Sequence, residues 1–66
     1  MDLKQKAIEN IKLIYKNKSS LKEEAMEALG LVGGEEAMQA IMSIYNKKTA
    51  LKAEAMIAIG NAVKNS

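Results

Sequence analysis

Residues 7–36 read AIENIKLIYKNKSSLKEEAMEALGLVGGEE, and residues 37–66 read AMQAIMSIYNKKTALKAEAMIAIGNAVKNS. Aligned without a gap, the two stretches are identical at twelve positions, among them Tyr15 and Tyr45. A period of about 30 residues is typical of proteins that stack small structural units. The sequence therefore predicts a duplication, with repeat one at about 3–33 and repeat two at about 34–65, in a single domain spanning residues 1–66.

Each repeat holds two stretches in which apolar residues recur at the 3.6-residue period of an α-helix. The first stretch runs from about residue 3 to 16, and the second follows Ser20. The residues predicted to face the core in repeat one are Leu3, Ala7, Ile11, Ile14, Tyr15, Leu21, Ala25, Ala28, Leu29 and Val32. Those predicted for repeat two are Met38, Ile41, Ile44, Tyr45, Leu51, Ala55, Ala58, Ile59 and Ala62.

The connections between these helices are short, so neighbouring helices are expected to be antiparallel. Ser20 and Glu23 have the spacing of a capping box at the start of the second helix, with Asn17 or Ser19 as alternative caps. Gly33 and Gly34 predict its end, because glycine adopts the left-handed conformation that a helix stop often needs. The predicted fold class is all-α: two tandem helical hairpins, four helices in total, stacked as a short α-α solenoid.

The composition argues against catalysis. Cys and His are absent, so the common nucleophile–base pairs and ordinary transition-metal sites cannot be assembled. Glu24 and Glu27 lie one helical turn apart and could share a hard cation, but solvated helix flanks usually look the same. We expect no catalytic residue, no cofactor and no metal site, and therefore no enzyme.

The size of the chain favours a partner. A domain near 60 residues buries only about 60% of the surface that its unfolded chain exposes, so it needs additional stabilisation. Without Cys, disulfides cannot supply it, which leaves helix packing, self-association or another protein.

Localisation is predicted from what the chain lacks. No segment approaches the ~20 apolar residues that span a bilayer. The first fifteen residues include Asp2, Lys4, Lys6 and Glu9 and lack the apolar core of a signal peptide. We expect a cytoplasmic protein that does not enter the membrane.

The repeat also resembles a known family. Ala7-Ile8, Ile11, Ile14-Tyr15, Leu21-Lys22, Ala25, Ala28-Leu29-Gly30, Val32-Gly33 and their counterparts in repeat two form the pattern. This pattern is similar to the HEAT-like repeat of the phycobilisome-lyase type, although Lys22 and Lys52 stand where that family commonly has Arg. The resemblance covers nearly the whole chain and implies a short right-handed helical stack used as an interaction surface. It does not imply lyase activity, since the repeat occurs with many functions.

Lysines gather at the two predicted turns within the repeats: Lys16, Lys18, Lys22, Lys47, Lys48 and Lys52. Stacked hairpins would place all six along one edge, where an anionic partner such as a nucleic-acid backbone could dock. The net charge is only +2 and every cation is Lys, which disfavours nucleic acid. Lys near a helix C-terminus is also stabilised by the helix dipole without any ligand.

A difference between the copies points to a protein partner. Polar residues of repeat one correspond to apolar ones in repeat two, namely Met42, Ala53 and Ile57. A solenoid needs polar terminal units for solubility, so this asymmetry favours an interface over scattered surface residues. We expect a small protein-interaction or scaffold module that self-associates through Met42 and Ile57 about a two-fold axis. The alternative function is a nucleic-acid-binding accessory protein that uses the lysine edge.

Overall fold

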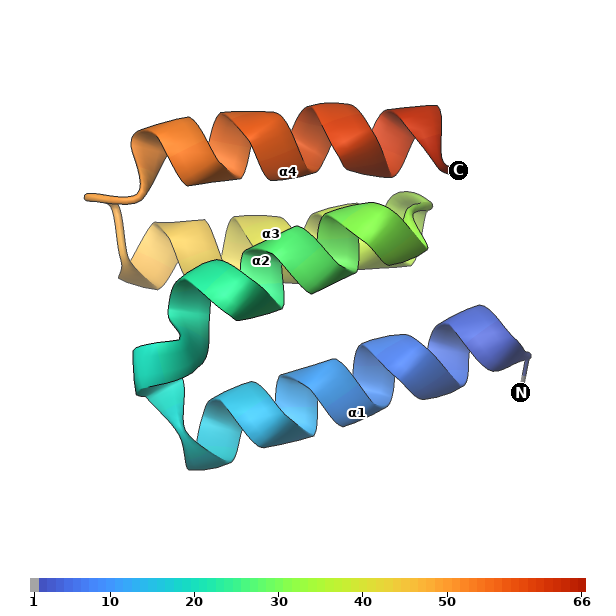
Figure 1. Ribbon diagram of the computed structural model, residues 1–66, viewed down its shortest axis with the longest axis horizontal. Helices are drawn as coiled ribbons and strands as arrows, with labels where there is room; N and C mark the ends of the chain where they lie inside the picture. The colour runs from blue at the N-terminus through green and yellow to red at the C-terminus, as the bar shows by residue number, and fades with distance from the viewer. Residues whose placement is uncertain (1) are drawn as a thin grey trace.

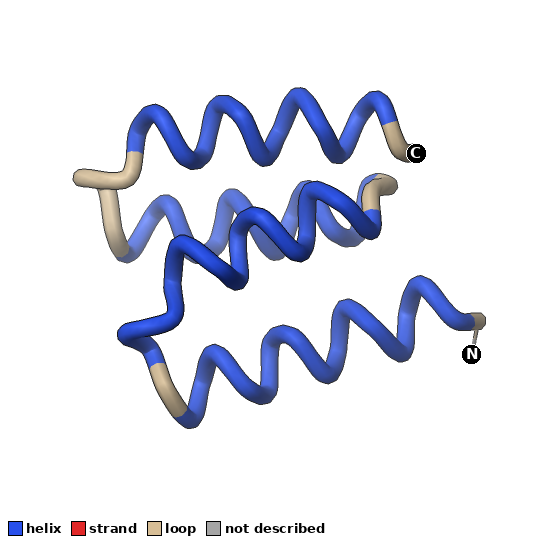
Figure 2. Tube along the Cα trace, viewed as in Figure 1, coloured by secondary structure: helices blue, strands red, loops and turns tan. Residues whose placement is uncertain are grey.

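The computed structural model describes residues 2–66, so Met1 of the predicted domain lies outside the described residues. Within that range the chain forms four α-helices and one short 3-10 turn, with no strand (Figures 1 and 2). The helices are α1 (Leu3–Asn17), α2 (Lys22–Val32), α3 (Glu35–Lys47) and α4 (Lys52–Lys64), and the turn is Ser19–Leu21. The all-α prediction is confirmed.

The helices form two consecutive hairpins. α1 and α2 make the first, α3 and α4 the second, and the most extensive contact between helices joins α2 to α4. Figure 1 shows α1 and α4 on opposite sides, with α2 and α3 between them. The molecule measures 31 × 26 × 15 Å along its principal axes.

The helix starts differ from the prediction at one point. A capping box opens α1, where the Asp2 carboxylate accepts a hydrogen bond from the Gln5 amide at 2.8 Å. The predicted capping box of Ser20 and Glu23 is wrong. Ser20 belongs to the 3-10 turn, and Leu21, which stands at the N-cap of α2, has no side-chain oxygen to offer. The turn is instead closed by the Leu21 amide, which donates to the Lys18 carbonyl at 3.0 Å.

The predicted stop at Gly33 and Gly34 is confirmed. Both glycines have positive φ, 79° and 95°, and the Gly33 amide donates to the Leu29 carbonyl at 3.0 Å. Gly33 also permits a close approach, because a Cβ there would overlap the carbonyl oxygen of Asn65. Gly33 is therefore required both by the turn and by the packing of the end of α4.

Polar contacts join the end of α4 to α1, to α2 and to the turn between α2 and α3. The Asn65 side-chain amide donates to the Gly30 carbonyl at 3.1 Å, and the Gly34 amide donates to the Ala62 carbonyl at 3.1 Å. These carbonyls lie in the last turns of α2 and α4, where they have no acceptor role within their own helices. The Lys4 ammonium donates to the Asn65 carbonyl at 3.0 Å. Residues that follow α2 and α4 thus donate hydrogen bonds to carbonyl groups in the last turn of the other helix.

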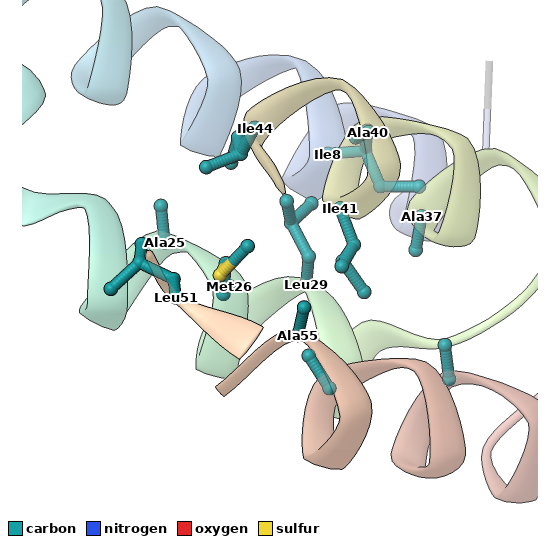
Figure 3. Packing of buried hydrophobic residues seen from close by; sticks show 12 residues of the cluster. Ile8, Ala25, Met26, Leu29, Ala37, Ala40, Ile41, Ile44, Leu51 and Ala55 are labelled. Atoms are coloured by element: carbon teal, nitrogen blue, oxygen red, sulfur yellow. The ribbon is translucent and has the colours of Figure 1, made fainter. Parts of the chain in front are cut away.

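A single apolar cluster fills the space between the hairpins (Figure 3). Its buried members are Ile8, Ala25, Met26, Leu29, Ala37, Ala40, Ile41, Ile44, Leu51, Ala55, Ala58 and Ala62. Alanines supply half of these positions, which allows helix backbones to approach closely, while Ile, Leu and Met fill the remaining volume. Every predicted core residue of repeat two is buried or half-buried, as expected.

The predicted core of repeat one needs correction. Leu3 and Ile14 are exposed, whereas Ile8 and Met26 are buried and were missed. α1 therefore turns the face of Ile8, Ile11 and Tyr15 toward the core, where it packs against α2 and α3.

Equivalent residues of the two repeats differ in burial according to their place in the stack. Ile14 is 56% exposed while its counterpart Ile44 is 5% exposed, because repeat one covers Ile44 and no repeat covers Ile14. The reverse holds for Met26, which is 0% exposed, and Met56, which is 74% exposed. Each repeat thus has one covered and one uncovered face.

Candidate functional site

The six predicted lysines lie at one end of the molecule. Lys16 and Lys47 occupy the last turns of α1 and α3, Lys18 and Lys48 follow those helices, and Lys22 and Lys52 begin α2 and α4. Figure 1 shows the two turns within the hairpins on the same side of the molecule. All six are exposed except Lys22, which is half-buried.

An open groove of about 670 Å³ runs between α1 and α3. Its lining residues are Glu9, Lys12, Leu13, Tyr15, Lys16, Ser19, Ala40, Ser43, Ile44, Lys47 and Lys48. Three of the six predicted lysines, Lys16, Lys47 and Lys48, line this groove, and Lys12 joins them. With one glutamate against four lysines above apolar side chains, the groove suits an acidic, partly apolar ligand.

Sequence reasoning missed this groove and did not include Lys12 in the predicted lysine edge. The groove depends on the distance between the first helices of the two hairpins. Periodicity shows which residues share a helix face, but it does not give this distance.

The two tyrosines pack against the core. Tyr15 and Tyr45 are half-buried at equivalent positions beside the apolar cluster. This is the usual arrangement of a tyrosine with an apolar ring body and a polar tip, and it requires no ligand.

The predicted interface residues Met42, Ala53 and Ile57 are all exposed. Ile57, at 67%, is among the most exposed large apolar side chains, and Ala53 lies one turn before it on α4. Met42 belongs to α3. Their accessibility leaves these residues free to contact a partner, and their role stays a prediction.

α4 exposes more apolar surface than the sequence comparison indicated. Met56 and Val63 are exposed as well as Ile57, and Gly60 lies between them on the helix. Met56 and Gly60 were overlooked because repeat one has the same residues, Met26 and Gly30, at those positions. Comparing the sequences of the repeats does not reveal residues that are identical in type but differ in burial.

The carboxylates form no metal site among residues 2–66, where no group of three or more Asp or Glu side chains could hold an ion. Glu24 and Glu27, the pair considered for a hard cation, are both exposed on α2.

No helix within the described part of the chain is long and apolar enough to cross a membrane.

Comparison of the chain with family models, with curated proteins and with solved structures gave no match.

Proposed function

We propose that this protein is a small, non-catalytic protein-interaction or scaffold module that self-associates. The observation that carries this proposal is the exposed apolar surface of α4, where Met56 is 74% and Val63 is 58% exposed, with the exposed Gly60 between them along the helix. Contiguous exposed apolar surface is a usual sign of an interaction site.

The small core adds to the argument. Fully buried large side chains are few in residues 2–66: Ile8, Met26, Leu29 and Ile41. Burying one large aliphatic side chain contributes ~1.5–3 kcal/mol, so covering the apolar face of α4 would add substantially to a core of this size.

The repeat itself belongs, in this proposal, to the HEAT-like kind of the phycobilisome-lyase type. The motif that runs from Ala7 to Gly33 and the paired hairpins are both compatible with that assignment. The proposed location is the cytoplasm, and the proposed partner is a protein, either another chain or a second copy.

The test is the solution mass across a range of concentrations. Sedimentation equilibrium of the unmodified chain should give an average mass that rises from the monomer value between about ten micromolar and a millimolar. A constant monomer mass over this range would contradict self-association.

The second candidate function is that of a nucleic-acid-binding accessory protein. The observation in its favour is the convergence of Lys12, Lys16, Lys47 and Lys48 on one groove. The absence of Arg counts against it, since Arg is the preferred residue for bidentate contacts to phosphate. Retention on immobilised DNA that falls steeply with salt, together with a constant monomer mass, would favour this candidate.

A further inference from the structure

The junction between the two repeats is built around Met26 and Gly30. Met26 of α2 is 0% exposed, and Figure 3 shows it within the buried cluster, between Leu29 and Leu51. One turn further along α2, Gly30 lets α4 approach so closely that a Cβ at this position would lie 3.0 Å from the Ala58 carbonyl oxygen. Met26 and Gly30 thus form the side of the junction that repeat one contributes.

α4 carries the same pair on its exposed surface. Met56 and Gly60 are the counterparts of Met26 and Gly30, and both are exposed. A Cβ added at Gly60 would meet no heavy atom within 4 Å among residues 2–66. Repeat two therefore carries the same side of the junction as repeat one, but there it is exposed.

The other side of the junction, against which Met26 packs, is also present in both repeats. In repeat two, Ile44, Leu51 and Ala55 are buried in the cluster around Met26. Their counterparts in repeat one border an apolar hollow of about 160 Å³ between α1 and α2, which is lined by Ile11, Ile14, Tyr15, Leu21, Glu24, Ala25 and Ala28. Ile14, and Leu31, which is the counterpart of Asn61, are exposed.

We propose that copies of this chain associate head to tail, so that Met56 of one copy enters the hollow bordered by Ile14 in the next. Ala28 of the second copy, the counterpart of Ala58, then lies against Gly60. Methionine suits this role because it is unbranched and fills irregular apolar space. This inference rests on the proposed function and specifies its geometry.

A second copy is the occupant that fits both uncovered faces at once. The chain already contains one contact of this kind, between its own repeats. One free face repeats its Met26 and Gly30 as Met56 and Gly60, and the other repeats its Ile44, Leu51, Ala55 and Ala58 as Ile14, Leu21, Ala25 and Ala28. The intermolecular contact is expected to be weaker than the internal one. Val63 replaces Gly33, whose missing side chain allows the close approach of Asn65. The α2 helix of the next copy must therefore lie further from α4 near Val63.

This arrangement differs from a two-fold contact through Ile57. Glu27, the counterpart of Ile57, remains exposed at the internal junction, so Ile57 lies beside the head-to-tail contact rather than in it. A head-to-tail contact uses two different faces and continues into open chains or closes into rings, whereas a two-fold contact ends at a dimer.

The experiment blocks one face at a time. Met56→Glu blocks the projecting face and Ile14→Glu blocks the hollow. Both positions are mostly exposed in the single chain, and the helical content and melting temperature of each variant verify that it is folded. If either substitution disturbs folding, Gly60→Gln and Leu31→Glu replace them, since these positions also face solvent. Ile57→Glu is the matched control, because it places the same charge on α4 outside the proposed contact.

Sedimentation equilibrium then distinguishes the arrangements. We expect the unmodified chain and Ile57→Glu to grow beyond the dimer with concentration. Each blocked variant alone should be monomeric at the same concentrations, with a dissociation constant raised at least about tenfold. An equimolar mixture of Met56→Glu and Ile14→Glu should form a one-to-one dimer, because each supplies the face that the other lacks.

Two results would overturn this inference. If the unmodified chain stops at a dimer that Ile57→Glu dissociates, and mixing the blocked variants restores nothing, the contact is two-fold and the proposed function still stands. If the unmodified chain stays monomeric at about a millimolar, both the head-to-tail contact and the proposed self-association are wrong.

Discussion

Gly30 and Gly60 are the same residue at the same place in the repeat, yet their surroundings impose opposite demands. A Cβ at Gly30 would lie 3.0 Å from the Ala58 carbonyl oxygen and 3.2 Å from its Cα, both of which are backbone atoms that cannot move without shifting α4. At Gly60 the same Cβ would meet no atom of residues 2–66 within 4 Å. The repeated sequence therefore encodes a close contact in one copy and open helix surface in the other.

The matched pair Gly30→Ala and Gly60→Ala tests this difference. Both gain about 1 kcal/mol of helix propensity. Gly30→Ala also overpacks the α2–α4 contact, which costs ~1–3 kcal/mol. Urea unfolding at low micromolar concentration should therefore show Gly60→Ala to be more stable than the parent, and Gly30→Ala to be less stable than Gly60→Ala by ~1–3 kcal/mol. Equal stability of the two variants would show that α4 moves away from α2 without cost.

At the scale of the helices, the sequence predicted the elements well and their orientation less well. The bounds of α1 and α2 follow from the 3.6-residue pattern and from the two glycines, which are local features. The exposure of Ile14 and the burial of Met26 could not be predicted in the same way. Ile14 and Ile44 have similar local patterns, as do Met26 and Met56, and only the presence or absence of a neighbouring repeat separates them. The α1–α3 groove was missed for the same reason, because it arises from the relative placement of two hairpins.

The alanine face of the second helices offers a test at this scale. Ala25 and Ala55 are both buried, at 6% and 4% exposure, and Ala53 is exposed on the same helix as Ala55. Ala55→Leu should lower the free energy of unfolding by ~1–3 kcal/mol, because three further carbon atoms overpack the cluster there. Ala25→Leu should lower it by less, because Ala25 borders the hollow between α1 and α2. Ala53→Leu is the control and should change the stability little. Unchanged melting temperatures for both buried variants would contradict the helix faces described above.

At the scale of the whole molecule, the distribution of charge separates the two candidate functions. Changing the groove lysines Lys12, Lys16, Lys47 and Lys48 to Gln removes the same charge as changing Lys6, Lys18, Lys52 and Lys64, which lie outside the groove lining. All eight side chains are exposed, and exposed charges contribute little to stability, so both variants should melt close to the parent. We expect the two variants to show equally weakened retention on DNA, because each loses four positive charges. Selective loss of micromolar binding in the groove variant would make the nucleic-acid candidate the better one.

α1 is held to the rest of the molecule by little apolar burial, and this has a consequence for its motion. Ile8 is the one residue of Leu3–Asn17 that is buried, while Leu13 and Ile14 face solvent. Local opening costs least where few apolar contacts must break, so α1 should detach in fluctuations that leave α2, α3 and α4 folded.

Native-state hydrogen exchange would measure this. The amides of α1 should exchange through an opening of lower free energy than the amides near Met26, Leu29 and Ile41, which lie at the centre of the cluster. Equal protection of all four helices would mean that the chain opens as one cooperative unit. With α1 detached, the side of Ile44 and Ala40 that borders the groove would be uncovered, so an apolar peptide that binds there would trap the opened form and accelerate exchange in α1 alone.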